Sequence, residues 1–236
     1  MTEPLKSEEL DALRRIDTPT ICNLIEMVAP DRRGFGFTTR HLHCIFPDLP
    51  PMVGYARTVT ARAKEPGPLD AEASMEKRFD YVDYVAQGPA PRVSVVQDLD
   101  DQPGRGAFWG EVNSTVHKAL GCLGTVTNGS VRDLDMIAPG FQFLAGVVGP
   151  SHAFVHIEDF GVQVDIHGMV VCSGDLVHAD RHGAVVIPHD VARDVAPALD
   201  LMQRREAVVI EAARDPGFTT DMLKDAYRRS AAIKTQ

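Results

Sequence analysis

The chain has 236 residues, of which 44% are hydrophobic and 24% charged, as expected for a globular protein that can bury a sizeable core. Its formal net charge of −9 argues against nucleic acid or an anionic membrane as the main partner. No apolar run long enough to cross a membrane and no signal-peptide pattern are found, so a cytoplasmic location is expected, and four scattered cysteines predict free, buried thiols.

Two helices are predicted near the N-terminus, over about residues 7–28. Ser7 opens the first, and Thr18 caps the second with Pro19 at its first helical position. The following segment, 31–51, combines Arg, His and Pro residues and is expected to be irregular. Its basic residues either reach over a substrate or form a solvated surface, and the sequence leaves both interpretations open.

The middle of the chain alternates between strand and helix patterns. Strands are predicted over 53–63 and 92–97, and apolar residues at helical spacing predict a helix over 71–85. Three acids follow the second of these strands: Asp98, Asp100 and Asp101. Acids at the carboxyl end of a strand can bind a metal, but a hydrated loop is their more common role.

Residues 110–135 indicate the helix, strand and loop of a βαβ crossover. The helix is predicted to begin near Gly110 and to stop at Gly121. Its expected apolar face consists of Val112, Val116, Ala119 and Leu120. A buried strand is predicted next, over 123–127, and ends in the turn signal Asn128-Gly129. Parallel strands joined in this way place their carboxyl ends at one edge of the sheet, where open α/β sheets bind ligands.

The residues at this predicted edge suit a small anionic substrate and a hard divalent cation. Unpaired N–H groups of Val112 and Asn113 at the helix start can bind a carboxylate. Asp133 offers an oxygen ligand for Mg²⁺ or Mn²⁺, and Glu111 could hold or deprotonate a water on that ion. The fork-shaped Arg132 suits an enolate oxygen or a second carboxylate. The alternative is an ordinary Arg-Asp salt bridge in a turn and a Glu favoured by the helix dipole.

The second half of the chain is rich in short predicted strands, punctuated by glycines. These strands are expected at 141–148, 153–157, 162–166, 169–171, 176–178 and 184–187. Helices follow over about 190–229, interrupted by Pro197 and resumed in a last helix that Thr220 caps. Histidines are frequent in this half, but none of them has the spacing of a zinc site.

Several segments together resemble one known family. Gly110-Glu111, followed after twenty residues by Arg132-Asp133, is similar to the family's signature. Three further segments resemble it in the same chain order: 18–20, 53–59 and 173–188. One branch of this family consists of the class II, metal-dependent 4-hydroxy-4-methyl-2-oxoglutarate/4-carboxy-4-hydroxy-2-oxoadipate aldolases. The other branch consists of the regulator of ribonuclease E activity A and its relatives (RraA-like proteins).

The resemblance implies an α/β fold of the swivelling β/β/α, phosphohistidine-domain-like type. Residues 1–236 would form a single domain, with flanking helices at about 7–28 and 190–229. It also implies a homotrimer or a dimer of trimers. In family aldolases an acid from the C-terminal region of a neighbouring subunit completes the water shell of the metal, and Glu206 is the candidate here.

The resemblance also implies roles for the residues of the signature. Asp133 would bind Mg²⁺ or Mn²⁺ directly and Glu111 would contact it through water. Arg132 would lie over the keto or enolate oxygen, while the amides of Val112 and Asn113 would take the pyruvyl carboxylate. Two departures stand out: Met136 occupies a position where aldolases usually carry an acid, with Asp135 one residue earlier, and the turn His178–His182 replaces an acid-rich turn.

The expected function is therefore that of a divalent-metal-dependent lyase. It would form a pyruvate enolate by retro-aldol cleavage of a 4-hydroxy-2-oxo acid, and could also decarboxylate oxaloacetate. Two alternatives remain open at this point. One is a non-catalytic regulator that binds a ribonuclease or another protein, for which Met136 leaves room. The other is the same enolate chemistry on a different 2-oxo acid.

Overall fold

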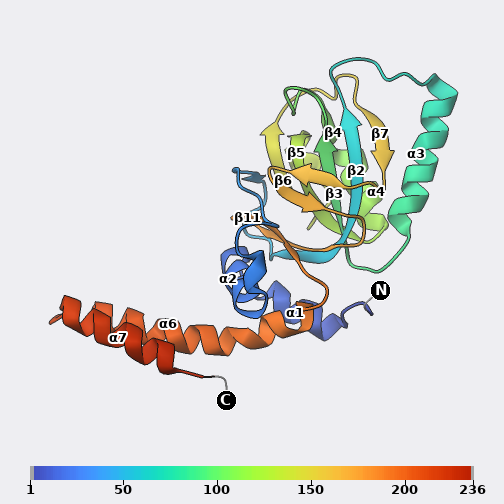
Figure 1. The fold of residues 1–236 in the computed structure, drawn as a ribbon. Helices are drawn as coiled ribbons and strands as arrows, with labels where there is room; N and C mark the ends of the chain where they lie inside the picture. The colour runs from blue at the N-terminus through green and yellow to red at the C-terminus, as the bar shows by residue number, and fades with distance from the viewer. Residues whose placement is uncertain (1–2, 235–236) are drawn as a thin grey trace.

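The computed structural model describes residues 3–234 and shows a mixed α/β fold around a curled nine-stranded sheet (Figure 1). The strands of the sheet are β1 (His43–Cys44), β2 (Met52–Arg62), β3 (Arg92–Asp98), β4 (Ala107–Trp109), β5 (Cys122–Val131), β6 (Gln142–Val148), β7 (His156–Phe160), β10 (Leu176–Asp180) and β11 (Gly183–Ile187). They follow the order β1-β6-β5-β3-β2-β10-β11, with β4 paired to β5 and β7 paired to β2. A separate hairpin consists of β8 (Val164–Ile166) and β9 (Met169–Val171).

Parallel strands form the centre of the sheet. β2 pairs with β3, β3 with β5 and β5 with β6, all in parallel, which confirms the parallel crossover predicted around residues 110–135. All residues of β2 except Arg62 are buried, as is typical of parallel strands covered on both faces. The β8–β9 hairpin supplies part of one cover, because Val164, Ile166 and Met169 pack into the apolar cluster that holds the centre of the sheet.

The helices lie at the flanks of the sheet. Their bounds are α1 (Ser7–Arg14), α2 (Thr18–Val28), α3 (Ala71–Ala86), α4 (Glu111–Ala119), α5 (Ala192–Val195), α6 (Leu199–Arg214) and α7 (Thr220–Ala232). Apolar residues of α1, α2 and α5 pack against β10 and β11 in a second cluster. α6 and α7 pair with each other and project away from the sheet (Figure 1). Among residues 3–234, no helix combines the length and apolar character needed to cross a membrane.

Some predicted boundaries are wrong by one or a few residues. Asp17, not Thr18, caps α2 by accepting a hydrogen bond from the Thr20 N–H at 2.9 Å, and Thr219, not Thr220, caps α7. The strand expected at 153–157 is shifted to His156–Phe160, because it pairs with the end of β2. The cysteines are free as predicted, but their burial differs from the prediction: Cys122 is buried, Cys22 and Cys44 are half-buried, and Cys172 is exposed.

The predicted turn at Asn128-Gly129 is wrong, because β5 continues through both residues to Val131. The side chain of Asn128 explains the difference. Its Oδ1 accepts a hydrogen bond from the Asp98 N–H at 2.7 Å, and its Nδ2 donates to the Asp98 carbonyl at 3.0 Å. The side chain thus satisfies the neighbouring strand where the backbone register shifts between Thr127 and Ser130.

The expected apolar face of α4 is also wrong. Val112 is 70% exposed and Val116 37% exposed, whereas Ser114 and His117 are buried. Both buried polar side chains are hydrogen-bonded: the Ser114 hydroxyl donates to the Glu111 carbonyl and accepts from the Ala138 N–H. Polar groups that are satisfied in this way can occupy a buried face, which a pattern of apolar residues does not reveal.

The turn His178–His182 begins inside the core. The imidazole of His178 is buried, donates from Nε2 to the Ile16 carbonyl at 2.9 Å and bonds through Nδ1 to the Thr18 hydroxyl at 3.0 Å. Asp180 accepts from the Thr18 N–H, so the turn ties α2 to β10. The side chains of His178 and Asp180 therefore serve an internal contact within the chain.

Candidate functional site

The residues of the Gly110…Asp133 signature lie together in an open crevice at the carboxyl end of β5. The crevice has a volume of about 380 Å³. Its walls include Arg78, Phe108, Gly110, Glu111, Val112, Asn113, Arg132, Asp133, His152 and Val155. The start of α4 and the loop after β5 meet there because β4, which leads into α4, pairs in parallel with β5.

Asp133 has an unusual backbone conformation that directs its carboxylate to the start of α4. Its φ of 56° and ψ of 38° lie in the left-handed region, which is uncommon for a residue other than glycine. Its Oδ2 lies 3.4 Å from the Glu111 N–H and 3.6 Å from Nε of Arg132. Both Arg132 and Asp133 remain about one-third exposed, so the ion pair faces the crevice.

The helix start provides unpaired backbone donors beside this carboxylate. The Ser114 N–H bonds to the Gly110 carbonyl, so the amides of Val112 and Asn113 precede the first intrahelical bond and have no carbonyl one turn earlier. The helix dipole makes this end attractive for an anion. The Asn113 side chain donates to the Phe108 carbonyl and is thereby turned away from these amides.

The buried side chain of His117 holds α4 in place from the interior of the protein. The Nδ1 of His117 lies 2.7 Å from the Asn113 carbonyl, and its Nε2 lies 2.8 Å from the Tyr81 hydroxyl. Burial lowers the pKa of His117 from 6.5 to about 4, so the ring is neutral, with Nδ1 donating and Nε2 accepting. Its ring also packs edge-on against Trp109, with the ring centroids 4.7 Å apart. The support under the crevice is therefore uncharged.

The oxygen donors of the crevice fit a divalent cation that keeps most of its waters, and not one that protein ligands enclose completely. Within residues 3–234, no group of three or more His, Cys, Asp or Glu side chains is arranged to hold a metal. Mg²⁺ needs only one or two protein carboxylates, since it keeps several waters. Asp133 could bind it directly and the exposed Glu111 through water. Gly110 leaves open space next to Oδ2 of Asp133, which a Cβ atom would fill.

Other residues named from the sequence lie elsewhere. Glu206 is exposed on α6, in the projecting pair of helices and away from the crevice of its own chain (Figure 1). Met136 is 57% exposed and closes the short 3-10 turn Leu134–Met136, in which Asp135 is also exposed. Neither Met136 nor Asp135 lines the crevice.

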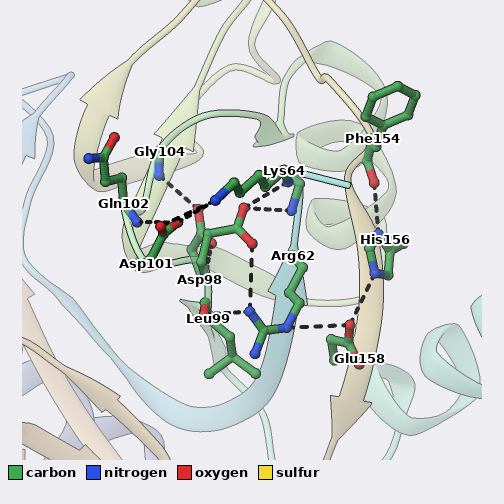
Figure 2. A network of polar contacts seen from close by, with 12 residues as sticks. Arg62, Lys64, Asp98, Leu99, Asp101, Gln102, Gly104, Phe154, His156 and Glu158 are labelled. Atoms are coloured by element: carbon green, nitrogen blue, oxygen red, sulfur yellow. Dashed lines mark hydrogen bonds and ion pairs between the residues drawn. The ribbon is translucent and has the colours of Figure 1, made fainter. Parts of the chain in front are cut away.

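The acids after β3 organise a loop. Asp98 accepts from the Gly104 N–H at 2.7 Å (Figure 2). Asp100 accepts from the N–H groups of Ala63 and Lys64 at 2.9 and 2.8 Å. Burial raises the pKa of Asp98. Asp101 is exposed and pairs with Lys64 at 3.2 Å. The acids lie in a loop, as the second interpretation expected, but Asp98 and Asp100 are buried in it rather than hydrated.

Several lining residues were not found from the sequence. Arg78 comes from α3. His152 and Val155 precede β7, and the pairing of β7 with β2 brings these two residues to the crevice. In the sequence, Arg78 is only a cation on a predicted helix. In the structure, the apolar residues Met75 and Phe79 of the same helix are exposed. The charge of Arg78 becomes informative only once the position of α3 is known.

Fold and crevice together define a mixed α/β protein with an Arg-Asp pair at a helix start. The chain belongs to the RraA-like family (Aldolase/RraA), whose model matches residues 18–186. Protein DlpA of Legionella pneumophila is 27% identical over 158 residues, which cover 63% of this chain. The match spans only 24% of the length of DlpA.

Solved structures show the same fold. An uncharacterized protein from Pseudomonas syringae aligns with a TM-score of 0.71 at 23% identity, over 96% of each chain. RraAS2 of Streptomyces coelicolor, described as an unusual member of the RNase ES inhibitor RraA protein family, aligns with a TM-score of 0.62 at 23% identity. That alignment covers 87% of this chain and 97% of RraAS2. The family thus includes both aldolases and ribonuclease inhibitors.

Proposed function

We propose that the protein is a divalent-metal-dependent carbon–carbon lyase that forms a pyruvate enolate from a 4-hydroxy-2-oxo acid. One observation supports this most strongly. Asp133 adopts a left-handed conformation, and its carboxylate lies 3.4 Å from the Glu111 N–H at the start of α4, in an open crevice shared with Arg132. Left-handed residues other than glycine are uncommon and cluster at functional sites, which supports a functional role for Asp133.

The substrate would bind through its pyruvyl half. Its carboxylate accepts hydrogen bonds from the amides of Val112 and Asn113 at the positive end of the helix. Its 2-oxo oxygen lies toward Arg132, whose planar guanidinium can donate two parallel hydrogen bonds. Arg132 and the two amides thereby fix the bond between C3 and C4 in the open part of the crevice.

Asp133 would hold Mg²⁺ or Mn²⁺, and the bound ion supplies Lewis acidity at the 2-oxo group. Glu111 accepts the 4-hydroxyl proton through an intervening water. The C3–C4 bond then breaks, and its electron pair becomes part of a pyruvate enolate that Arg132 stabilises. Protonation at C3 gives pyruvate and releases an aldehyde or ketone. Decarboxylation of oxaloacetate would give the same enolate without needing Glu111 as base.

The assembly is part of the proposal. A homotrimer or a dimer of trimers would bring α6 of one subunit to the crevice of the next, where Glu206 could complete the water shell of the ion. The position of α6 supports this arrangement, because α6 and α7 extend away from their own sheet (Figure 1).

The test is pyruvate release from 4-hydroxy-4-methyl-2-oxoglutarate and from oxaloacetate, with Mg²⁺ or Mn²⁺ and with EDTA. Turnover of either that EDTA abolishes would support the lyase, and the ratio of the two rates would separate aldolase from decarboxylase. Metal binding without turnover of either would favour the same chemistry on a different 2-oxo acid. Neither metal binding nor turnover would favour a non-catalytic regulator of a ribonuclease or another protein.

A further inference from the structure

A second hollow opens directly beside the crevice, between α3 and the chain leading into β7. It has a volume of about 370 Å³, within the usual range for small-molecule sites. The two hollows share four lining residues: Arg78, Phe108, Asn113 and Val155. The second hollow, which we call the α3 hollow, therefore adjoins the part of the crevice at the start of α4.

The surface of the α3 hollow is mainly apolar. Phe108, Phe154, Leu69 and Ile157 contribute to its walls, together with prolines of the loop 66–69. Phe154 is 56% exposed and Leu69 44% exposed in the chain. Large apolar side chains gathered around a concave surface are characteristic of ligand sites. Two phenylalanines on its walls favour a ring-shaped ligand group, since aromatic rings pack well against one another.

Among the titratable side chains that line the α3 hollow, Lys77, His156 and Glu158 are bonded within the wall, and Arg78 stands where the hollow joins the crevice. Glu158 bonds to Nε2 of His156 at 3.1 Å and lies 3.6 Å from Nε of Arg62 (Figure 2). The Nδ1 of His156 bonds to the Phe154 carbonyl at 2.8 Å, and Lys77 donates to the Glu158 carbonyl. Because these polar groups already have partners, a ligand would be stabilised mainly by covering the apolar side chains and removing them from water.

The same contacts make the wall rigid. A Cβ atom on Gly67 would lie 2.9 Å from the imidazole of His156, so the loop 66–69 packs closely on that ring. His156 in turn is held between the Phe154 carbonyl and Glu158 (Figure 2). The α3 hollow is thus formed by the fold before a ligand arrives, which lowers the entropic cost of binding.

We propose that the α3 hollow is the subsite for the half of the substrate that leaves, and that it accepts an apolar, ring-sized group on C4. The inference rests on the proposed lyase function, which places the pyruvyl half at the start of α4. C4 then lies toward Arg78 and Phe108, where the two hollows join. The preferred substrates are 4-hydroxy-2-oxo acids with an aryl or similar group on C4, cleaved to pyruvate and the corresponding aldehyde.

The chemistry balances without a further reactant. The 4-hydroxyl of 4-hydroxy-2-oxo-4-phenylbutanoate gives up its proton while the C3–C4 bond breaks. The C4–O group thereby becomes the carbonyl of benzaldehyde. The electron pair of the broken bond enters the enolate, which takes a proton at C3 to give pyruvate. Benzaldehyde is left in the α3 hollow and pyruvate in the crevice.

The test uses 2-oxo-4-phenylbutanoate, which cannot undergo the cleavage, and 2-oxobutanoate, which lacks the ring. Calorimetric titration with Mg²⁺ present should give at least about tenfold tighter binding for the phenyl compound, because binding removes the apolar surface of its ring from water. Ser74→Trp places a large side chain in the α3 hollow from the exposed face of α3. This variant should remove the advantage of the phenyl compound and change the binding of 2-oxobutanoate by no more than about twofold.

Glu76→Trp is the matched control, since Glu76 is exposed on the same helix, two residues further on, and lines neither hollow. It should keep the advantage of the phenyl compound. Equal binding of both compounds by the unmodified protein, or an advantage that survives Ser74→Trp, would overturn the proposal for the α3 hollow. Turnover separates the two proposals: oxaloacetate cleavage without a phenyl advantage retains the lyase and rejects the subsite. Absence of metal binding, together with absence of pyruvate from oxaloacetate and from 4-hydroxy-2-oxo-4-phenylbutanoate, would reject the lyase, whatever the binding of the phenyl compound.

Discussion

A Cβ atom on residue 110 would lie 2.5 Å from Oδ2 of Asp133, so the position of this carboxylate depends on glycine at residue 110. Gly110→Ala should push the carboxylate away from the start of α4 and lower kcat/KM for pyruvate release by at least about tenfold. The free energy of unfolding should change by only about 1 kcal/mol, because Gly110 has extended dihedral angles that alanine can adopt.

The control for this variant is Gly34→Ala. A Cβ atom there meets nothing within 4 Å, so this change should leave both kinetics and thermal unfolding unaltered. If Gly110→Ala keeps full activity, the carboxylate does not need its present position.

Asp133→Asn keeps the shape of the side chain and removes its charge. A neutral amide is a poor ligand for Mg²⁺ beside Arg132, so we expect a loss of pyruvate release of about a hundredfold or more, and weak metal binding. Calorimetry with Mg²⁺ or Mn²⁺ measures the binding separately from catalysis. EDTA-sensitive turnover that persists in this variant would remove Asp133 as the ligand.

Arg132→Lys keeps the positive charge but loses the planar fork. If Arg132 stabilises the enolate through two parallel hydrogen bonds, kcat should fall by about ten- to a hundredfold with a smaller change in KM. Steady-state kinetics on oxaloacetate and on a 4-hydroxy-2-oxo acid give both values. A variant with undiminished kcat on both substrates would contradict the role assigned to Arg132.

The neutral His117 under α4 predicts a dependence of stability on pH. Its pKa is about 4 in the folded protein and 6.5 for a free histidine, so the unfolded chain binds a proton first as the pH falls. Stability should therefore be lost between about pH 6.5 and pH 4, by up to about 3 kcal/mol from this residue. The buried His178, whose pKa burial also lowers, should act in the same direction.

Urea unfolding of the unmodified protein and of His117→Gln, at about pH 7 and pH 4.5, measures this contribution. Glutamine does not titrate, so the variant should lose less stability than the unmodified protein between the two pH values. Equal losses would show that His117 does not titrate as its surroundings imply.

Glu206 can be tested by complementation between subunits. Glu206→Gln alone should lower activity by about tenfold if its carboxylate serves the crevice of a neighbouring subunit. Mixed oligomers of Asp133→Asn and Glu206→Gln chains should then regain activity, because some crevices combine an intact Asp133 with an intact Glu206. No gain over the separate variants, in oligomers shown to be mixed, would exclude this shared arrangement.

Much of the fold was predictable from local patterns. The strands 53–63 and 92–97, the helix 71–85 and the start of α4 lie close to their observed bounds because each is long or clearly capped. The meeting of Glu111, Arg132 and Asp133 agrees with the predicted parallel crossover, although the short strand β4, which leads into α4 and pairs with β5, was not predicted. The family is shown by the match over residues 18–186. The finer phosphohistidine-domain-like assignment and the single-domain organisation stay predictions.

The errors at Asn128 and on the buried face of α4 share a physical cause: tertiary hydrogen bonds that no local pattern contains. Asn128 has the side chain of a turn residue, but it bonds to the backbone of Asp98 on the next strand and continues the sheet. His117 is a polar residue on a buried face because Tyr81, 36 positions earlier, satisfies its ring. The left-handed Asp133 and the α3 hollow likewise depend on how distant segments pack.

The two hollows are built from separable parts of the chain. The crevice takes its chemical groups from β4, α4 and the loop after β5, whereas the α3 hollow takes most of its surface from α3, the loop 66–69 and the approach to β7. Leu69 and Phe154 are exposed and line the α3 hollow but not the crevice that holds Arg132 and Asp133. Descendants of such a protein could therefore diversify in the compounds they accept while the bond-breaking apparatus is inherited unchanged.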